Sequence, residues 1–400
     1  MGAAQEMLRQ WTACVKSDLL AGLHGHQAKA LAAVSLGVAL AGHCHSGRVA
    51  PLVPGRGRPA SARRRVERLV ANPRLRVRSG EVAASGAWAA AVLSRWAGRP
   101  LVLILDETPG PGGAGGLRCL RVSGGYRGRA VPLAWVCYRE GELPDRMPRL
   151  VWRLLRRVAR CLAVAAAGAD GADGADGADG ADGADGRPAG ITDVTLVADR
   201  GLSWPSVLDC CVLLGWHYVL RVQSTTRVER VERADRLGRV REVRAGALAR
   251  RPGDRWSGRV RAFKKAGWRD VHFTAVRDPA CKQPWLLVSD RPGPARHVLN
   301  YGKRVWCEET HRDDKGQAFH WDKSRVTNPA RAARLLLVLA LATLLAAAIG
   351  ARVIKRGLRR HLDPRRRRTL SLVQLGLRWL RHALTDGDLT LPLDRLALPP

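Results

Sequence analysis

The chain has 400 residues, a formal net charge of +33 and an isoelectric point near 11.3. This length allows a sizeable core and more than one domain. So strong a positive charge repels itself unless a polyanion screens it, which favours nucleic acid over an anionic membrane surface as the partner. The nine cysteines form no C-x-x-C pair, so they argue against a disulfide-stapled scaffold.

Residues 1–95 are predicted to form an all-helical, DNA-binding region. The first 20 residues mix charged and polar side chains throughout, so we expect no secretory signal and a cytoplasmic location. Ser61 is expected to cap a basic helix that stops before Pro73. Three arginines of this helix are candidates for phosphate contacts, with a solvated basic helix as the alternative: Arg63, Arg64 and Arg65.

Two apolar strands are each predicted to end in an aspartate. The run L-V-L-I-L at 101–105 precedes Asp106, and T-D-V-T-L-V-A at 192–198 precedes Asp199. Sites in α/β sheets form at the carboxyl ends of strands, so side-by-side packing would bring both aspartates together. The glycine-rich stretch 110–116 predicts a hairpin rather than a dinucleotide loop, because a strand-like segment follows it.

Between and after the aspartates, hydrophobic periodicity predicts further regular elements. The repeat of six Gly-Ala-Asp triplets from Gly168 to Asp185 cannot form a packed core and is expected to be a disordered acidic loop. The predicted strands and helices are strands 117–122, 130–138 and 216–222, and helices 148–166 and 204–214.

The second half of the chain contains a β-rich segment and a long apolar one. Residues 223–297 are rich in arginine and in short strand-like pieces, and predict an insertion. Residues 333–350 are apolar enough for a membrane span. They include Arg334, and basic residues flank them on both sides. A buried core helix is therefore the preferred interpretation.

The stretch 300–316 predicts a single helix, with asparagine as its N-cap and glycine just past its end. At about 100° per residue, four polar side chains would share an arc of roughly 60°: Tyr301, Arg304, Glu308 and Lys315. Glu309 would point about 100° away from Glu308, so the two carboxylates are not interchangeable. A solvated helix face is the plain alternative.

Three carboxylates could together hold divalent cations: Asp106, Asp199 and Glu308. Hard cations such as Mg²⁺ prefer oxygen ligands. Like-charged carboxylates are costly to hold together unless a cation offsets them. A pair of ions roughly 4 Å apart performs phosphodiester chemistry, which agrees with the positive charge of the chain.

The four-residue spacing resembles the Tyr-Arg-Glu-Lys signature of bacterial insertion-sequence transposases of the DDE type. That signature leaves two, three and six intervening positions, and residues 301–315 match it without a gap. Lys315 adds weight because only nine of the 68 basic residues are lysine. The segments around Asp106 and Asp199 and the β-rich insertion also resemble the family, so the resemblance covers about residues 60–350.

The resemblance implies an RNase H-like α/β fold, a mixed sheet flanked by helices. It implies a pair of Mg²⁺ ions, for which Mn²⁺ can substitute, on Asp106, Asp199 and Glu308. It also implies a nucleoid-associated homodimer on double-stranded DNA, which holds paired terminal inverted repeats and target DNA, with no membrane partner. The implied DNA contacts are Tyr301, Arg304, Lys315 and Arg200, with Trp256 or Trp268 as candidates for stacking on an extruded base.

The expected organisation has five parts. A helical DNA-binding region at 1–95 precedes the first part of the catalytic core at 96–222, which contains the disordered repeat at 168–186. A β-rich insertion follows at 223–297, then the second part of the core at 298–352 and a basic helical tail at 353–400. The predicted function is cleavage of transposon ends and joining of the 3′-hydroxyl to target DNA. Two alternatives stay open, an inactive DNA-binding relic and an RNase H-like nuclease without strand transfer.

Overall fold

The computed structural model describes residues 3–20, 23–54, 58–75, 83–96, 98–113, 115–170, 193–234, 240–364 and 368–386. Most of the Gly-Ala-Asp repeat lies outside these residues, so the loop expected there stays a prediction. The first triplet, residues 168–170, belongs to the end of a helix. The chain beyond residue 386 also lies outside the described part.

Ten strands of the described residues form one mixed sheet, in the order β3-β2-β1-β4-β5-β10-β9-β8-β6-β7. The pairs β1–β4 and β4–β5 are parallel and the other neighbours are antiparallel. The strands are β1 (Leu101–Pro109), β2 (Leu117–Tyr126), β3 (Arg129–Arg139), β4 (Val194–Ala198), β5 (His217–Arg221), β6 (Arg227–Ala234), β7 (Val240–Arg244), β8 (Arg255–Ala262), β9 (Arg269–Val276) and β10 (Trp285–Ser289).

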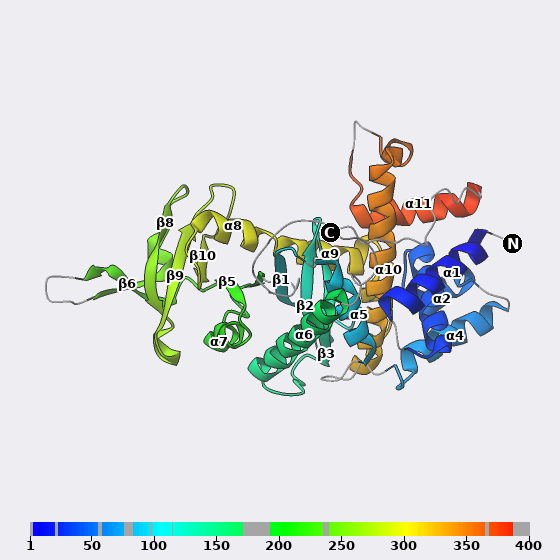
Figure 1. Ribbon diagram of the computed structural model, residues 1–400, viewed down its shortest axis with the longest axis horizontal. Coiled ribbons are helices and arrows are strands. Elements are labelled where there is room, and N and C mark those ends of the chain that lie inside the picture. The colour runs from blue at the N-terminus through cyan, green and yellow to red at the C-terminus, as the bar shows by residue number, and fades with distance from the viewer. Residues whose placement is uncertain are drawn as a thin grey trace, which may run out of the picture.

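Helices flank this sheet and gather at the N-terminal end of the molecule (Figure 1). They are α1 (Ala3–Cys14), α2 (Gly25–Ala41), α3 (Ser46–Val49), α4 (Pro59–Ala71), α5 (Ala83–Leu93), α6 (Met147–Asp170), α7 (Pro205–Leu213), α8 (Pro294–Gly302), α9 (Val305–Arg312), α10 (Pro329–Lys355) and α11 (Leu372–Asp386). The architecture is the mixed α/β class expected from the sequence, with a helical N-terminal region.

The strands of segment 223–297 continue the central sheet. β10 pairs with β5, and β9, β8, β6 and β7 follow outward. Figure 1 shows this extension at the end of the molecule opposite α1 and α4. The expected β-rich character of the segment is therefore present, and its strands are hydrogen-bonded to the core rather than to one another alone.

The apolar helix α10 is a core element. It is long and apolar enough to cross a membrane, but 94% of its most apolar window is buried inside the protein. It packs against α2, α11 and β3, and the Trp135 indole donates to its Ala333 carbonyl at 3.0 Å. A helix that is apolar all round is buried in this way, so the expectation of a core helix is confirmed.

The basic helix α4 begins earlier than predicted. Pro59 occupies its first turn and Arg58 its N-cap, so Ser61 lies inside the helix and does not cap it. Proline at the first helical position has its φ already set for the helix and lacks only an N–H that would be unpaired there. The helix ends at Ala71, before Pro73, as expected.

Strand β1 presents its two faces to two different clusters of side chains. Leu101, Leu103 and Leu105 belong to the large core, whereas Val102 and Ile104 contact the smaller cluster that contains Tyr301 and Cys307 of α8 and α9. Side chains alternate along a strand. The residue at position 106 therefore faces α8 and α9.

Candidate active site

The pairing of β1 with β4 brings the two aspartates to one place. The parallel register ends with Leu105 beside Ala198, so Asp106 and Asp199 are the next residues along two neighbouring strands. Their proximity was expected. The predicted end of the first strand at residue 105 was wrong. Strand β1 continues to Pro109 through its pairing with β2, and only its pairing with β4 stops at Leu105.

The segment 300–316 is not one helix, and Asn300 is not an N-cap. Helix α8 begins at Pro294 and ends at Gly302, and a new helix, α9, begins at Val305. Glycine is a poor helix former, and the two helices rest on different strands. α8 packs on β4, β5 and β9, whereas α9 packs on β1, β2 and β3.

After α9 the chain forms a short π-helix, η6 (Asp313–Gln317), in place of the predicted helical end. Its two adjacent aspartates are both buried against the sheet. Asp313 pairs with Arg129 at 2.6 Å and Asp314 pairs with Arg121 at 2.5 Å. Successive residues of a regular helix point about 100° apart, so the wider turn allows both carboxylates to reach arginines of β2 and β3.

The guanidinium of Arg304 contacts all three predicted carboxylates. Its Nη2 lies 3.1 Å from Asp106 Oδ1 and 3.6 Å from Asp199 Oδ2. Its Nη1 donates to Glu308 Oε1, one helical turn further along. The structure therefore brings together Asp106, Asp199, Glu308 and Arg304 as a single charged cluster, to which we refer as the carboxylate cluster.

Burial and charge act against each other in this cluster. Burial raises the pKa of Asp106, and Arg304 offsets only part of that effect. For Asp199 burial also favours the neutral acid, but the Arg200 N–H and the Arg304 guanidinium outweigh it and lower the pKa. The pKa of Arg304 is raised despite its burial, because Asp106 and Asp199 favour its charged form. Asp106, the most buried of the acids, therefore depends on a nearby cation to remain ionised.

Tyr301 is buried and its hydroxyl donates to Asp199 Oδ1 at 3.1 Å. Its ring packs edge-on against Trp285, with centroids 5.0 Å apart. Burial and the neighbouring Asp199 charge raise its pKa, so it remains a neutral donor. In this structure Tyr301 therefore orients a carboxylate of the cluster.

Lys315 reaches the same edge of β1 from η6. Its Nζ donates to Thr108 Oγ1 at 2.8 Å. Burial, followed by the charge of Arg121, lowers its pKa. The four residues of the predicted stripe thus lie around one site. They come from α8, the turn after it, α9 and η6, and not from one continuous helix.

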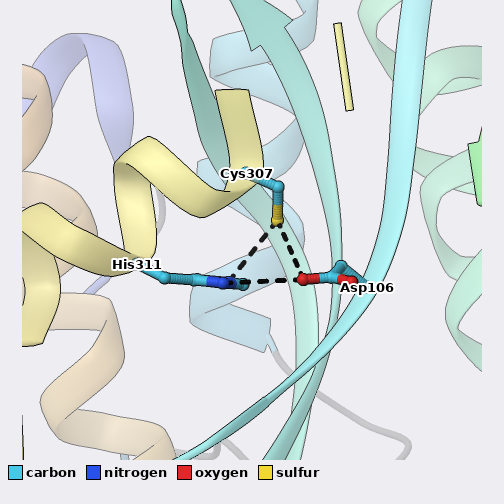
Figure 2. A group of neighbouring side chains, drawn as sticks. All are labelled: Asp106, Cys307 and His311. Carbon is cyan, nitrogen blue, oxygen red and sulfur yellow. Dashed lines mark hydrogen bonds and ion pairs between the residues drawn. The ribbon is translucent and has the colours of Figure 1, made fainter. Parts of the chain in front are cut away.

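Asp106 has further neighbours that the sequence interpretation missed. Its Oδ2 lies 3.5 Å from Cys307 Sγ and 3.5 Å from His311 Nδ1. Figure 2 shows these three side chains pointing toward one another, two from α9 and one from β1. The spacing of four residues between Cys307 and His311 was the available signal, because such residues share a helix face.

A small polar pocket adjoins Asp199. Four cationic side chains help to line it, namely Arg200, Arg221, Arg277 and Lys282. Arg200 donates to Gln283 at 2.7 Å, and Arg221 lies 3.7 Å from Asp199. Only Arg200 of this set was predicted, because the other three come from strands and loops whose packing the sequence does not reveal.

The two tryptophan candidates lie in the β-rich extension. Trp256 of β8 is half-buried under Arg230 and lines a hollow between β8, β9 and α8. Trp268 is also half-buried, with Arg261 over its ring. Neither has a described contact with the carboxylate cluster.

The three arginines belong to α4, a helix of the N-terminal region that lies apart from β1 and α9 (Figure 1). Arg63 pairs with Glu67 at 2.8 Å, one turn along the helix. Arg64 is exposed and Arg65 is half-buried. Their contact with DNA stays a prediction.

Comparison with known proteins adds an independent observation. Residues 162–345 match the family model described as "Transposase DDE domain". No curated protein matches the chain. The matched segment contains Asp199, Glu308 and the whole Tyr-Arg-Glu-Lys stretch, and the mixed sheet with its flanking helices fits the RNase H-like fold of such domains. The match therefore supports a DDE transposase, a class of enzymes that process DNA with divalent metal ions.

Proposed function

We propose that this protein is a transposase of the Tyr-Arg-Glu-Lys group, which cleaves DNA at transposon ends and joins the freed 3′-hydroxyl to target DNA. The single observation that carries the proposal is the convergence of Asp106, Asp199 and Glu308 on one guanidinium. Three carboxylates from two neighbouring strands and a crossing helix offer only oxygen donors, which suits Mg²⁺ or Mn²⁺.

The carboxylate cluster fits a divalent metal pair in charge as well as in donor type. Arg304 provides positive charge between the three acids in this structure, so the site already favours a cation at that position. Asp106, Asp199 and Glu308 would hold the ions. Bound there, the pair would supply activation of the attacking oxygen and stabilisation of the leaving oxygen.

The remaining residues would position the acids and the DNA. Tyr301 holds Asp199 through its hydroxyl. Arg304 would leave the carboxylates when the metal pair binds, and its charged fork would then be free for a phosphate. Lys315 supplies a second cation at the edge of β1, where it would contact the backbone of the DNA.

The basic pocket next to Asp199 supports DNA as the substrate. Arg200, Arg221, Arg277 and Lys282 place several positive charges on one side of the cluster. Phosphate contacts of this kind orient DNA without reading its sequence. We propose that the pocket binds the DNA backbone beside the scissile bond, and that a homodimer holds two DNA ends at once.

The test is Mg²⁺-dependent cleavage and joining of labelled DNA that carries the terminal inverted repeats flanking the gene. We expect nicking at the repeat ends and products covalently joined to target DNA. If Asp106→Ala, Asp199→Ala and Glu308→Ala all retain full cleavage, the proposal is wrong. Cleavage without joined products would indicate a nuclease, and DNA binding without cleavage under Mn²⁺ would indicate an inactive relic.

A further inference from the structure

The two carboxylate oxygens of Asp106 face different surroundings. Oδ1 accepts a hydrogen bond from Arg304 in the carboxylate cluster. Oδ2 points away from Arg304 toward Cys307 Sγ and a nitrogen of His311, each at 3.5 Å. Cys307 Sγ and His311 Nε2 are themselves 3.5 Å apart. A second potential metal site therefore shares one residue with the first.

The spacing of these donor atoms suits a tetrahedral zinc-type ion. Zinc–sulfur bonds of about 2.3 Å and zinc–nitrogen or zinc–oxygen bonds of about 2.0 Å place neighbouring donors roughly 3.3–3.6 Å apart. Asp106 Oδ2 and Cys307 Sγ lie at that spacing, 3.5 Å apart. His311 reaches it from each partner through a different ring nitrogen, Nδ1 toward Asp106 and Nε2 toward Cys307. With one donor atom per residue all three lie within 4.8 Å of one another, so the imidazole has to shift for a single nitrogen to bind the shared ion.

The chemistry of the donors selects a soft cation over Mg²⁺. A thiolate and an imidazole favour zinc and similar ions, whereas magnesium requires oxygen ligands and retains its waters. Three protein ligands leave the fourth tetrahedral position for water. The three residues are buried, with at most 9% of any of them exposed, so few waters compete for the donors.

Metal coordination uses the neutral imidazole of His311 and the thiolate of Cys307. The thiol proton of Cys307 therefore leaves when the ion binds.

We propose that Asp106, Cys307 and His311 bind one soft divalent cation of the zinc class, and that this ion inhibits the enzyme by taking an oxygen of Asp106. On binding, a metal–sulfur bond forms, the S–H bond breaks, and the proton passes to solvent. No oxidant or reductant is involved. The binding stands on the geometry alone, and the inhibition rests on the proposed DNA cleavage.

Co²⁺ provides the direct test, because it occupies tetrahedral zinc sites and gives a thiolate-to-metal absorption band. We expect the full-length, metal-free protein to bind Co²⁺ with this band and to release it when Zn²⁺ is added. Cys307→Ser should lose the band, and His311→Gln should weaken Zn²⁺ binding at least about tenfold. Cys281→Ser is the matched control, because Cys281 is a partly exposed cysteine outside the group, and it should keep the band.

A wild-type protein without the band, or a Cys307→Ser protein that keeps it, would overturn the binding site. Circular dichroism and thermal melting of each variant establish that it is folded. Calorimetric titration of Zn²⁺ in two buffers of different protonation enthalpy should also show proton release for the wild type and not for Cys307→Ser.

The inhibition is tested by adding Zn²⁺ to Mg²⁺-dependent cleavage and comparing each protein with its own zinc-free rate. The zinc concentration for half-inhibition should rise at least about tenfold in Cys307→Ser. Equal inhibition of both proteins would show that the ion acts elsewhere. If no protein cleaves DNA, the proposed function fails, while the Co²⁺ spectra still decide the metal site.

Discussion

Arg304 donates to Asp106 across 198 positions of sequence, with Nη2 3.1 Å from Oδ1. The same guanidinium also contacts Asp199 and Glu308. A side chain cation therefore occupies the point where three negative charges meet. Any metal pair that binds these acids must exchange with it.

Arg304→Gln is expected to destabilise the metal-free protein and to tighten metal binding. Removal of the guanidinium leaves the buried Asp106 without its cationic partner, which should cost about 3 kcal/mol of unfolding free energy. In the variant, Mn²⁺ no longer has to displace a guanidinium from the carboxylates. Mn²⁺ should therefore bind about tenfold more tightly, equivalent to about 1.4 kcal/mol. Denaturant unfolding and Mn²⁺ titration by electron paramagnetic resonance measure the two effects.

Arg304→Lys is the control for that experiment, since it keeps a charge but loses the planar fork. Its Mn²⁺ affinity should lie between those of the wild type and Arg304→Gln. An Arg304→Gln protein that binds Mn²⁺ no better than the wild type would show that the guanidinium does not compete for the site.

The buried pair of Arg121 and Asp314 is expected to fix η6 and Lys315 in place. Arg121→Met leaves the Asp314 charge buried and unpaired, which should cost about 3–5 kcal/mol. Arg121→Met/Asp314→Leu removes both charges and should recover most of that loss. Urea unfolding of the two single variants and the double variant gives the coupling energy, and additive losses would show that the pair is not coupled.

His297 is expected to make stability depend on pH. It joins α8 to the sheet, with Nδ1 2.8 Å from Thr274 Oγ1 and Nε2 2.8 Å from the Arg291 carbonyl. Burial lowers its pKa, although the hydrogen bond to Arg291 opposes this. Below about pH 6.5 the unfolded chain gains a proton that the folded protein does not accept.

The unfolding free energy should therefore fall as the solution is acidified below about pH 6.5, by at most about 1.4 kcal/mol per pH unit from this group. Unfolding in urea at several pH values measures the slope. His297→Gln cannot take up the proton, so its stability should change less with pH over that interval. Identical slopes in the two proteins would show that His297 does not contribute to the pH dependence of stability.

Gly376 is expected to be essential for the packing of α10 and α11. A Cβ atom at this position would lie 1.8 Å from the Ala346 carbonyl oxygen. Gly376→Ala should therefore force the helices apart and destabilise the protein by about 1–3 kcal/mol or more. Gly86→Ala is the control, because its Cβ would meet no atom within 4 Å, and a better helix former should add about 0.5–1 kcal/mol. Equal melting temperatures for both variants would contradict the close packing.

The sequence predicted those features that depend on local pattern or on strand order. The apolar runs before Asp106 and Asp199 identified two buried strands, and their parallel pairing followed from the α/β pattern. The apolar stretch 333–350 predicted a helix buried on all sides, and Arg334 with the basic flanks favoured a core helix over a membrane span. Elements that are buried on all sides have largely apolar sequences.

The features that the sequence did not predict depend on tertiary contacts. The helix break after Gly302 and the π-turn at η6 arise because α8 and η6 are held by different strands. Helix α8 is held near the end of β4, where Tyr301 donates to Asp199. The η6 turn is held on β2, where Asp314 pairs with Arg121. A helical-wheel projection treats the segment as isolated. The projection predicted that Tyr301, Arg304, Glu308 and Lys315 lie near one another. It could not show that the Arg304 guanidinium contacts the three acids.

The assignment of Glu308 as a metal ligand beside Asp106 and Asp199 is tested by a comparison of Glu308→Gln with Glu309→Gln in Mg²⁺-dependent DNA cleavage. Glu308 contacts Arg304 in the carboxylate cluster. Its neighbour Glu309 lies outside the cluster and pairs with Arg312 at 2.6 Å and with Arg129 at 4.0 Å. We predict that Glu308→Gln lowers the cleavage rate at least about a thousandfold and that Glu309→Gln stays within about threefold of the wild type. Equal rates in the two variants, or a larger loss in Glu309→Gln, would contradict the assignment of the site.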